Sequence, residues 1–160
     1  MVIFSRINFV VILMLFFGLI LNILPLSDIL NSVKPPILLL ILIYWSIAFP
    51  DQVNLSYAFI SGIIMDILLI MPLGYNAFCY TVTIFLILLY YPQIRLQSNW
   101  NKMLSLLFIL IPYFLMSTVA NNILEIDYNI LNVFISIIIS IIIWPVLFKV
   151  LRFIRQKYIS

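Results

Sequence analysis

Six apolar stretches follow one another along this chain, and only short polar segments separate them. A helix needs about 20 apolar residues to cross the hydrocarbon core of a bilayer, and these stretches approach or reach that length. Hydrophobic residues make up 66% of the 160 residues and charged residues 8%, too few charges to cover a water-soluble domain. The sequence therefore predicts an all-α, polytopic integral membrane protein with spans near residues 7–26, 36–49, 53–70, 76–91, 103–120 and 130–148.

The second stretch, 36–49, is the shortest of the six. Pro35 and Pro36 stand at its start, where a helix loses nothing by a missing N–H. At 1.5 Å per residue its apolar part covers about 20 Å, so we expect the helix to begin near Val33 or to lie where the bilayer is thinned. The polar run Gln93–Lys102 is expected to separate the fourth and fifth apolar stretches. The spans fill the chain, and we expect residues 1–160 to form a single transmembrane domain.

The basic residues predict the orientation of this six-helix bundle. With both termini in the cytoplasm, seven of the eight Lys and Arg residues lie on the cytoplasmic side and only Lys34 lies outside. Orientation follows the Lys and Arg bias of short loops, so six spans with cytoplasmic termini are expected. A five-span alternative, with 36–49 re-entrant, would put Arg95 and Lys102 on the opposite side from either Arg6 or the C-terminal basic residues.

Asp66 is the one carboxylate within the six stretches. A carboxylate at the centre of an inserted helix costs about 2.5–3.5 kcal/mol, so we expect Asp66 to face other protein or water. In the six-span orientation it lies about one helical turn from the external end of its span. This position argues against a proton relay, because a relay needs titratable groups across the whole membrane thickness.

A ridge of small and polar residues leads to this carboxylate. Asn54, Ala58, Gly62 and Asp66 recur at every fourth position, which places them on one face of a helix. Small residues spaced in this way let two helices approach closely in lipid. The ridge therefore predicts a close helix contact, either with another helix of this chain or with a helix of a partner.

A catalytic site is hard to assemble from these residues. The chain has no histidine and one cysteine, Cys79, so neither an internal disulfide nor a His- or Cys-based metal site is expected. An aspartyl dyad needs two facing carboxylates. Ser136 and Ser140 lie four apart in an isoleucine-rich span and are expected to pack helices. We expect no enzyme, no cofactor, no metal and no nucleic-acid partner.

The segment 149–158 extends the last apolar stretch with four basic residues. Each base near an anionic leaflet is worth about 1 kcal/mol, so this segment is expected to lie against the cytoplasmic headgroups. Trp144, Phe153 and Tyr158 suit the aromatic belt of a membrane interface. The segment serves either as an anchor of topology or as a docking site for a cytoplasmic partner.

Residues 34–75 resemble a known family, the bacterial rod shape-determining protein MreD. The positions that carry the resemblance are Lys34, Pro35, Pro36, Tyr44, Trp45, Pro50, Val53, Asn54, Phe59, Gly62, Asp66, Leu73 and Gly74. The number of spans and the closing Trp144-Pro145 with basic residues after it also fit. The chain departs from the family pattern at Gln52, where a basic residue is common, and at Ala58, where glycine is common.

The resemblance implies a non-enzymatic subunit of the cell-elongation (Rod) complex in the bacterial inner membrane. Such a subunit controls rod shape through sidewall peptidoglycan synthesis. Its partners would be the single-span protein MreC, MreB filaments, and the synthase RodA with its transpeptidase. The resemblance also implies a fold like the six-helix membrane subunits of vitamin-uptake transporters. Structural and interaction roles are expected for Asp66, Gly62, Ala58, Asn54, Pro35, Tyr44, Trp45, Pro50 and Gly74.

Two other function classes stay open at this point. The first is a transporter subunit that captures a small vitamin-like solute from outside, with Asp66 near the external face and Tyr75 and Tyr113 as liners. The second is a small channel or proton-coupled carrier. A path through the bilayer needs several polar residues that face one another, and the stretches hold one carboxylate and a few serines and threonines, so the second class is disfavoured.

Overall fold

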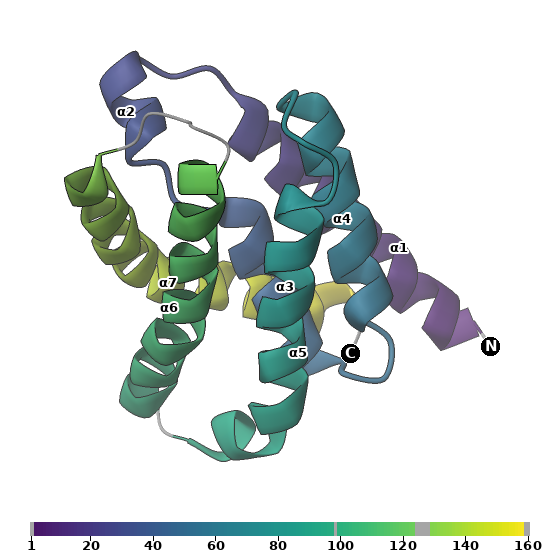
Figure 1. Cartoon of the computed structure of the whole chain (residues 1–160). Helices are drawn as coiled ribbons and strands as arrows, with labels where there is room; N and C mark the ends of the chain where they lie inside the picture. The colour runs from purple at the N-terminus through teal and green to yellow at the C-terminus, as the bar shows by residue number, and fades with distance from the viewer. Residues whose placement is uncertain (1, 98, 124–128, 159–160) are drawn as a thin grey trace.

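The computed structural model of this chain describes residues 2–97, 99–123 and 129–158 (Figure 1). The described residues form seven helices and no β-strand, which confirms the predicted all-α class. Each of the six predicted apolar stretches lies largely within one helix. The helices are α1 (Val2–Ile23), α2 (Asp28–Ser32), α3 (Ile37–Ala48), α4 (Leu55–Leu68), α5 (Tyr75–Leu96), α6 (Asn99–Ile123) and α7 (Ile130–Tyr158).

Several of these helices have the length and composition of membrane spans. Three described segments are long and apolar enough to cross a bilayer, namely Leu30–Ala48, Tyr75–Ile94 and Leu131–Tyr158. Three further apolar helices in the described part are shorter, namely Ile7–Ile23, Leu55–Leu68 and Phe108–Val119. The apolar helices fit a membrane protein, while the number of crossings and the side of each terminus stay predictions.

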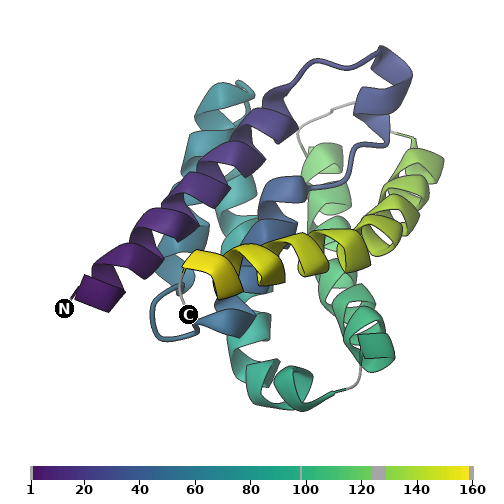
Figure 2. The ribbon, with the colours of Figure 1, turned by 180° about the vertical axis from the view of Figure 1, so that it is seen from behind.

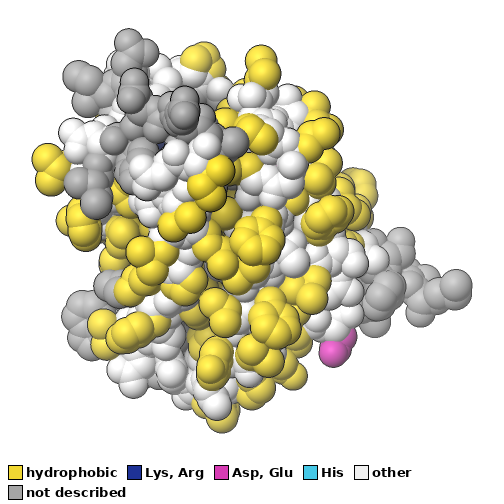
Figure 3. All heavy atoms as spheres, viewed as in Figure 1, with side chains coloured by type: hydrophobic (Ala, Val, Ile, Leu, Met, Phe, Trp, Pro, Cys, Tyr) yellow, Lys and Arg dark blue, Asp and Glu magenta, His cyan; other side chains and the backbone are white. Residues whose placement is uncertain are grey.

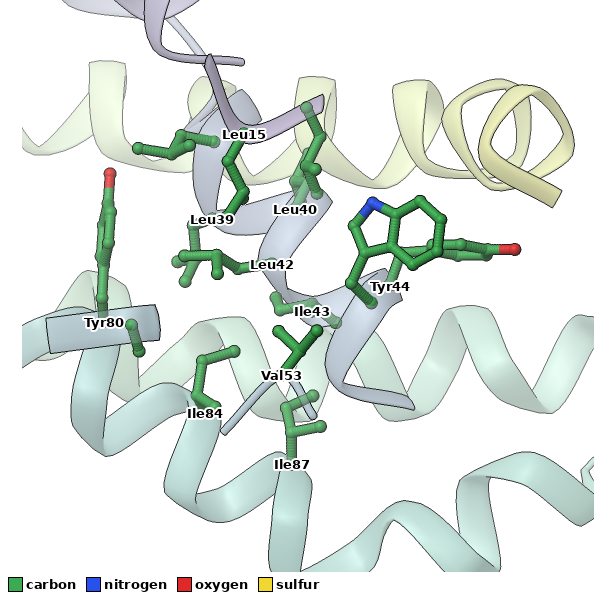
Figure 4. Close-up of a cluster of buried hydrophobic side chains, with 14 of the residues drawn as sticks. Leu15, Leu39, Leu40, Leu42, Ile43, Tyr44, Val53, Tyr80, Ile84 and Ile87 are labelled. Atoms are coloured by element: carbon green, nitrogen blue, oxygen red, sulfur yellow. The ribbon is translucent and has the colours of Figure 1, made fainter. Parts of the chain in front are cut away.

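Helix α3 forms the centre of the bundle. Its residues from Leu38 to Ser46 are all buried, and it contacts α1, α5 and α7. A helix that is apolar on every side is stable only when other elements enclose it. Figure 4 shows its side chains against residues of the neighbouring helices, among them Leu15, Tyr80, Ile84 and Ile87. Enclosure by protein explains how so short a helix is accommodated, since few of its side chains need to meet lipid.

The outer faces of the surrounding helices are strongly apolar. Large hydrophobic side chains are exposed on every long helix, for example Phe16 on α1, Phe78 on α5, Phe108 on α6 and Phe134 on α7. Figure 3 shows such side chains spread over the face formed largely by α4, α5 and α6. Water-soluble monomers rarely expose continuous apolar patches of more than a few hundred Å². This surface is suited to contact with lipid tails or with helices of other membrane proteins.

One end of the bundle is held by Lys34, which precedes α3. Its ammonium donates hydrogen bonds to the carbonyl oxygens of Asn22 and Leu24, each at 2.8 Å. These carbonyls belong to the last turn of α1 and the residue after it, where a cation and a donor are both favourable. The Asn22 side chain accepts the N–H of Ile37 at 3.0 Å, and the Ser136 hydroxyl of α7 donates to the Lys34 carbonyl at 3.0 Å. These contacts join α1, α3 and α7.

Helix α7 changes direction along its length. Its first half runs beside α6, and its second half crosses α3 (Figures 1 and 2). Pro145 lies inside the helix, and proline bends a helix because it removes one backbone hydrogen bond and its ring clashes with the preceding turn. The bend brings the basic C-terminal residues over the end of α3.

Three local features differ from the sequence-based expectations. The segment after α1 contains the short helix α2, closed by two hydrogen bonds between Asn31 and the backbone of Leu26. Val33 ends α2 and does not start α3, which has Pro36 as its N-cap. The break between α5 and α6 falls within the expected separator Gln93–Lys102 but is shorter than it, since α5 continues to Leu96 and α6 begins at Asn99. Polar residues such as Gln and Arg are good helix formers, so polarity alone does not end a helix.

Candidate functional site

The corner between α4 and α5 holds most of the ridge that the sequence singles out. Helix α4 starts after Asn54, whose side-chain oxygen accepts the N–H of Ser56 at 3.1 Å and so acts as an N-cap. The helix ends at Leu68, and a short turn leads to α5, which has Gly74 as its N-cap. Ala58, Gly62 and Asp66 are buried, whereas Asn54 is exposed.

The carboxyl group of Asp66 is completely buried and binds the start of α5. One oxygen, Oδ1, accepts the backbone N–H of Asn76 at 2.8 Å and the side-chain amide of Asn76 at 2.9 Å. The other, Oδ2, accepts the N–H of Gly74 at 2.9 Å and that of Ala77 at 3.5 Å. The first N–H groups of a helix have no partner within the helix, so Asp66 caps α5 from the neighbouring helix.

The hydrogen bonds of Asp66 offset the free-energy cost of burying its carboxylate. A buried polar group is tolerated when its hydrogen bonds are made, and both oxygens of Asp66 accept N–H groups. The N-terminal end of a helix also carries a partial positive charge, which favours an acceptor of this kind. The expectation that Asp66 faces other protein is therefore explained by the backbone of α5.

The turn between the two helices has an unusual backbone. Gly74 has a φ angle of +102°, which glycine adopts without strain and other residues rarely adopt. A Cβ atom at Gly74 would meet no heavy atom within 4 Å, so backbone conformation alone favours glycine there. Ile70 also has a positive φ, 55°, and the N–H of Met71 donates to the Asp66 carbonyl at 2.9 Å. The path of this turn places the Gly74 N–H within hydrogen-bonding distance of the Asp66 carboxylate.

Gly62 lies where α4 and α5 approach most closely. A Cβ atom at this position would lie 2.3 Å from the Cα atom of Ala77 and 2.5 Å from its backbone nitrogen. Real Cβ atoms are essentially never found so close to backbone, and only the lack of a side chain permits the contact. Gly62 and Asp66 therefore both contact α5 of the same chain, one turn apart on α4.

Tyr44, Trp45 and Pro50 lie at the opposite end of the bundle, near the end of α3 (Figure 1). Tyr44 and Trp45 are buried, with ring centroids 5.4 Å apart in an edge-to-face arrangement. The Tyr44 ring also packs edge-to-face against Phe148 of α7, and the Trp45 ring stacks on Phe49. The structure thus separates the predicted residues into two groups. Pro35 belongs to neither and lies half-buried before α3.

Asn76 was not singled out from the sequence, although it donates two hydrogen bonds to Asp66. The sequence does contain a signal for Asn76. It follows Leu73-Gly74 at the start of an apolar stretch, and asparagine is common at helix starts. Within the described residues, no three His, Cys, Asp or Glu side chains are grouped so that they could hold a metal ion. The chemistry of this site is hydrogen bonding that fixes one helix to another.

Gly62→Ala should destabilise the protein more than Gly18→Ala does. Alanine adds helix propensity of about 1 kcal/mol at either position, but at Gly62 the new methyl group meets the backbone of Ala77, and overpacking costs about 1–3 kcal/mol or more. At Gly18 the nearest atom, 2.8 Å away, is the flexible end of the Ile41 side chain. Thermal unfolding of both variants in detergent tests this order. Equal melting temperatures would contradict the close contact at Gly62.

Asp66→Asn should lower the free energy of unfolding by about 1–3 kcal/mol. The amide replaces one acceptor by an NH₂ donor, which must face either the N–H of Asn76 or those of Gly74 and Ala77. Unfolding of the purified protein by denaturant in detergent measures the loss. The control is Asp51→Asn, an exposed change with an expected effect below about 0.5 kcal/mol. A stability equal to that of the unchanged protein would show that these hydrogen bonds contribute nothing.

Comparison with known proteins identifies the family of this chain. The family model of the rod shape-determining protein MreD matches residues 4–154. The rod shape-determining protein MreD of Haemophilus influenzae is 28% identical over 128 residues, which are 79% of this chain and 78% of that relative. No solved structure gives a significant match. The resemblance seen in residues 34–75 is confirmed and extends over nearly the whole sequence, and the chain belongs to the MreD family of rod shape-determining proteins.

Proposed function

We propose that this protein is a non-enzymatic scaffold of the cell-elongation machinery in the bacterial inner membrane. Membership of the MreD family, over residues 4–154, gives the chain a role in determining rod shape and is the observation that carries the proposal. The scaffold would act in sidewall peptidoglycan synthesis. It would do so by holding membrane and cytoplasmic partners in one assembly, without chemistry of its own.

The hydrogen bonds of the buried polar side chains support a scaffold role, because these bonds are made to the protein's own backbone. Asp66 caps α5, and the hydroxyls of Ser61, Thr83 and Ser140 donate to backbone carbonyls one helical turn earlier in their own helices. Ser136 donates to the carbonyl of Lys34 and joins α7 to the start of α3. Ser136 and Asp66 thus connect helices, whereas the hydroxyls of Ser61, Thr83 and Ser140 are satisfied within their own helices.

The proposed partners are a single-span protein like MreC, MreB filaments, and RodA with its transpeptidase. They are inferred from the family resemblance. Two apolar grooves support docking of membrane helices. One, of about 500 Å³, lies between α1 and α4 and includes Ser56 and Ser61. The other, of about 610 Å³, lies between α5 and α6 and includes Gly74 and Cys79. Small residues at such surfaces let a second helix approach closely in lipid.

We further propose six spans with both termini in the cytoplasm. The distribution of Lys and Arg supports this orientation, and the described helices other than α2 run in alternating directions along the bundle (Figures 1 and 2). The Asp66 corner would then lie at the external end, and Tyr44 with the basic end of α7 at the cytoplasmic end.

Labelling of single cysteines tests this topology. In a Cys79→Ala background, Ser27→Cys should react with a membrane-impermeant maleimide in spheroplasts, and Asp51→Cys should react only after the membrane is opened. Both positions are exposed, so access depends on the side of the membrane. Reaction of both in sealed spheroplasts would contradict six spans and favour a re-entrant α3. Reaction of Asp51→Cys alone would reverse the orientation.

Depletion of this protein in its own bacterium should turn rods into round cells, and the intact gene should restore rods. An Asp66→Asn copy should restore them poorly, because the corner between α4 and α5 is weakened. Phase-contrast microscopy measures the ratio of cell length to width, and immunoblotting of membranes shows whether each copy accumulates. An Asp51→Asn copy is the matched control and should restore rods.

Rods that stay rods after depletion would contradict a role in shape in that bacterium. Full rescue by Asp66→Asn at normal membrane levels would contradict the importance given to the Asp66 hydrogen bonds, but not the role in shape. Loss of the Asp66→Asn protein from membranes would assign the defect to folding of this corner.

A cavity favours one alternative, capture of a small solute from outside. It measures about 400 Å³, and its lining includes Asn22, Lys34, Tyr80 and Tyr113. Of the residues expected for this function, Tyr113 lines the cavity, Tyr75 lines the α5–α6 groove, and Asp66 is covered by the start of α5. A solute-binding subunit should release a bound small molecule when the purified protein is denatured, and mass spectrometry would detect it.

A further inference from the structure

A second cavity lies at the other end of α3, where the second half of α7 crosses it. Its volume is about 180 Å³. A single water molecule needs roughly 10–15 Å³ measured in the same way, so the cavity can hold a larger group. Its apolar lining includes Ile43, Ile87 and Ile109, which come from α3, α5 and α6. Its charged lining consists of Arg152 and Arg155 of α7.

Tyr44 also lines this cavity, and its hydroxyl is a buried hydrogen-bond donor. Tyr44 is 2% exposed, and within the described residues its hydroxyl makes no hydrogen bond. Figure 4 shows the hydroxyl at the edge of the buried cluster, directed away from the labelled aliphatic side chains. Packing against Trp45 and Phe148 fixes the ring. Nearly all buried polar groups are hydrogen-bonded, so this hydroxyl indicates an acceptor that the described residues do not supply.

The two arginines give the site its charge preference. They are three residues apart, which places them on one face of α7, and both line the cavity. The guanidinium carbon of Arg155 lies 6.0 Å from the centre of the Tyr44 ring. Arginine is always charged and presents several N–H donors, a combination that suits phosphate oxygens.

We propose that this cavity binds the phosphate group of an anionic phospholipid, with Arg152, Arg155 and the Tyr44 hydroxyl as donors. The mixed lining selects a lipid as the source of the phosphate, because isoleucine side chains and a cationic pair in one cavity suit an acyl chain and its headgroup. Val150 and Phe153, on the same part of α7, are exposed apolar side chains suited to contact with lipid. The binding site goes beyond the scaffold role, and neither proposal requires the other.

Native mass spectrometry of the full-length protein in neutral detergent tests the site. The probes are phosphatidylglycerol, phosphatidylcholine and inorganic phosphate. The protein should retain one phosphatidylglycerol, with affinity at least about tenfold above that for phosphatidylcholine. Arg152→Gln with Arg155→Gln should weaken phosphatidylglycerol binding by about thirtyfold, about fivefold for each arginine.

Two further variants separate the site from general attraction to charge. Lys149→Gln with Lys157→Gln removes the same charge from exposed positions of α7 that do not line the cavity, and should weaken binding by less than about fivefold. Tyr44→Phe keeps the ring and its packing and removes only the hydroxyl, and should weaken binding by about tenfold. Tyr44→Phe therefore carries the test if the double arginine variant fails to fold.

Three results would overturn the proposal. Equal losses for the arginine and lysine pairs would mean attraction to surface charge alone. Unchanged binding by Tyr44→Phe would remove the hydroxyl from the site. Displacement of the lipid by inorganic phosphate at equal concentration would mean a site for a free anion and not for a lipid.

Discussion

The hydrogen bonds between Asp66 and the first N–H groups of α5 are the constraint on which this bundle depends. Lipid offers no partner to backbone N–H groups, so a helix that starts inside or near a bilayer needs acceptors from the protein. Asp66 supplies them from α4, and Gly62, one turn earlier, lets the two backbones touch. Helix α5 is thereby fixed in position, and it forms one wall around α3. One carboxylate and one glycine thus set the distance and the direction of the next helix.

The two ends of α3 differ in how completely their polar groups are satisfied. At its start, Lys34, Asn22 and Ser136 join three helices through hydrogen bonds. Toward its end, side-chain atoms of Tyr44, Trp45, Ser46 and Gln52 are buried without a hydrogen-bond partner among the described residues. Such atoms carry a cost unless something outside the chain meets them. The polar groups at the start of α3 are thus paired within the protein, whereas the end of α3 is suited to contacts with other molecules.

The sequence predicts the helices well because apolar length is a local property. It also predicts that Asp66 faces protein, since the cost of exposing a carboxylate to lipid does not depend on the fold. The partner of Asp66 could not be predicted, because it depends on the positive φ of Gly74 and on the path of the turn. The meeting of Tyr44 with Arg155 depends on the direction of the bend near Pro145, which no local pattern specifies. The continuation of α5 to Leu96 and the start of α6 at Asn99 show that polarity does not by itself end a helix.

The position of α3 has a consequence for how the chain is made. Residues 37–48 are synthesised before α5 and α7, which are two of the elements that enclose them. Until α7 is synthesised, Tyr44 lacks its contact with Phe148, and the side of α3 that α7 covers is open to lipid or to other proteins. The enclosure of α3 is therefore completed only after α7 has been made. A chain that stops before α7 would display its most buried helix to the membrane.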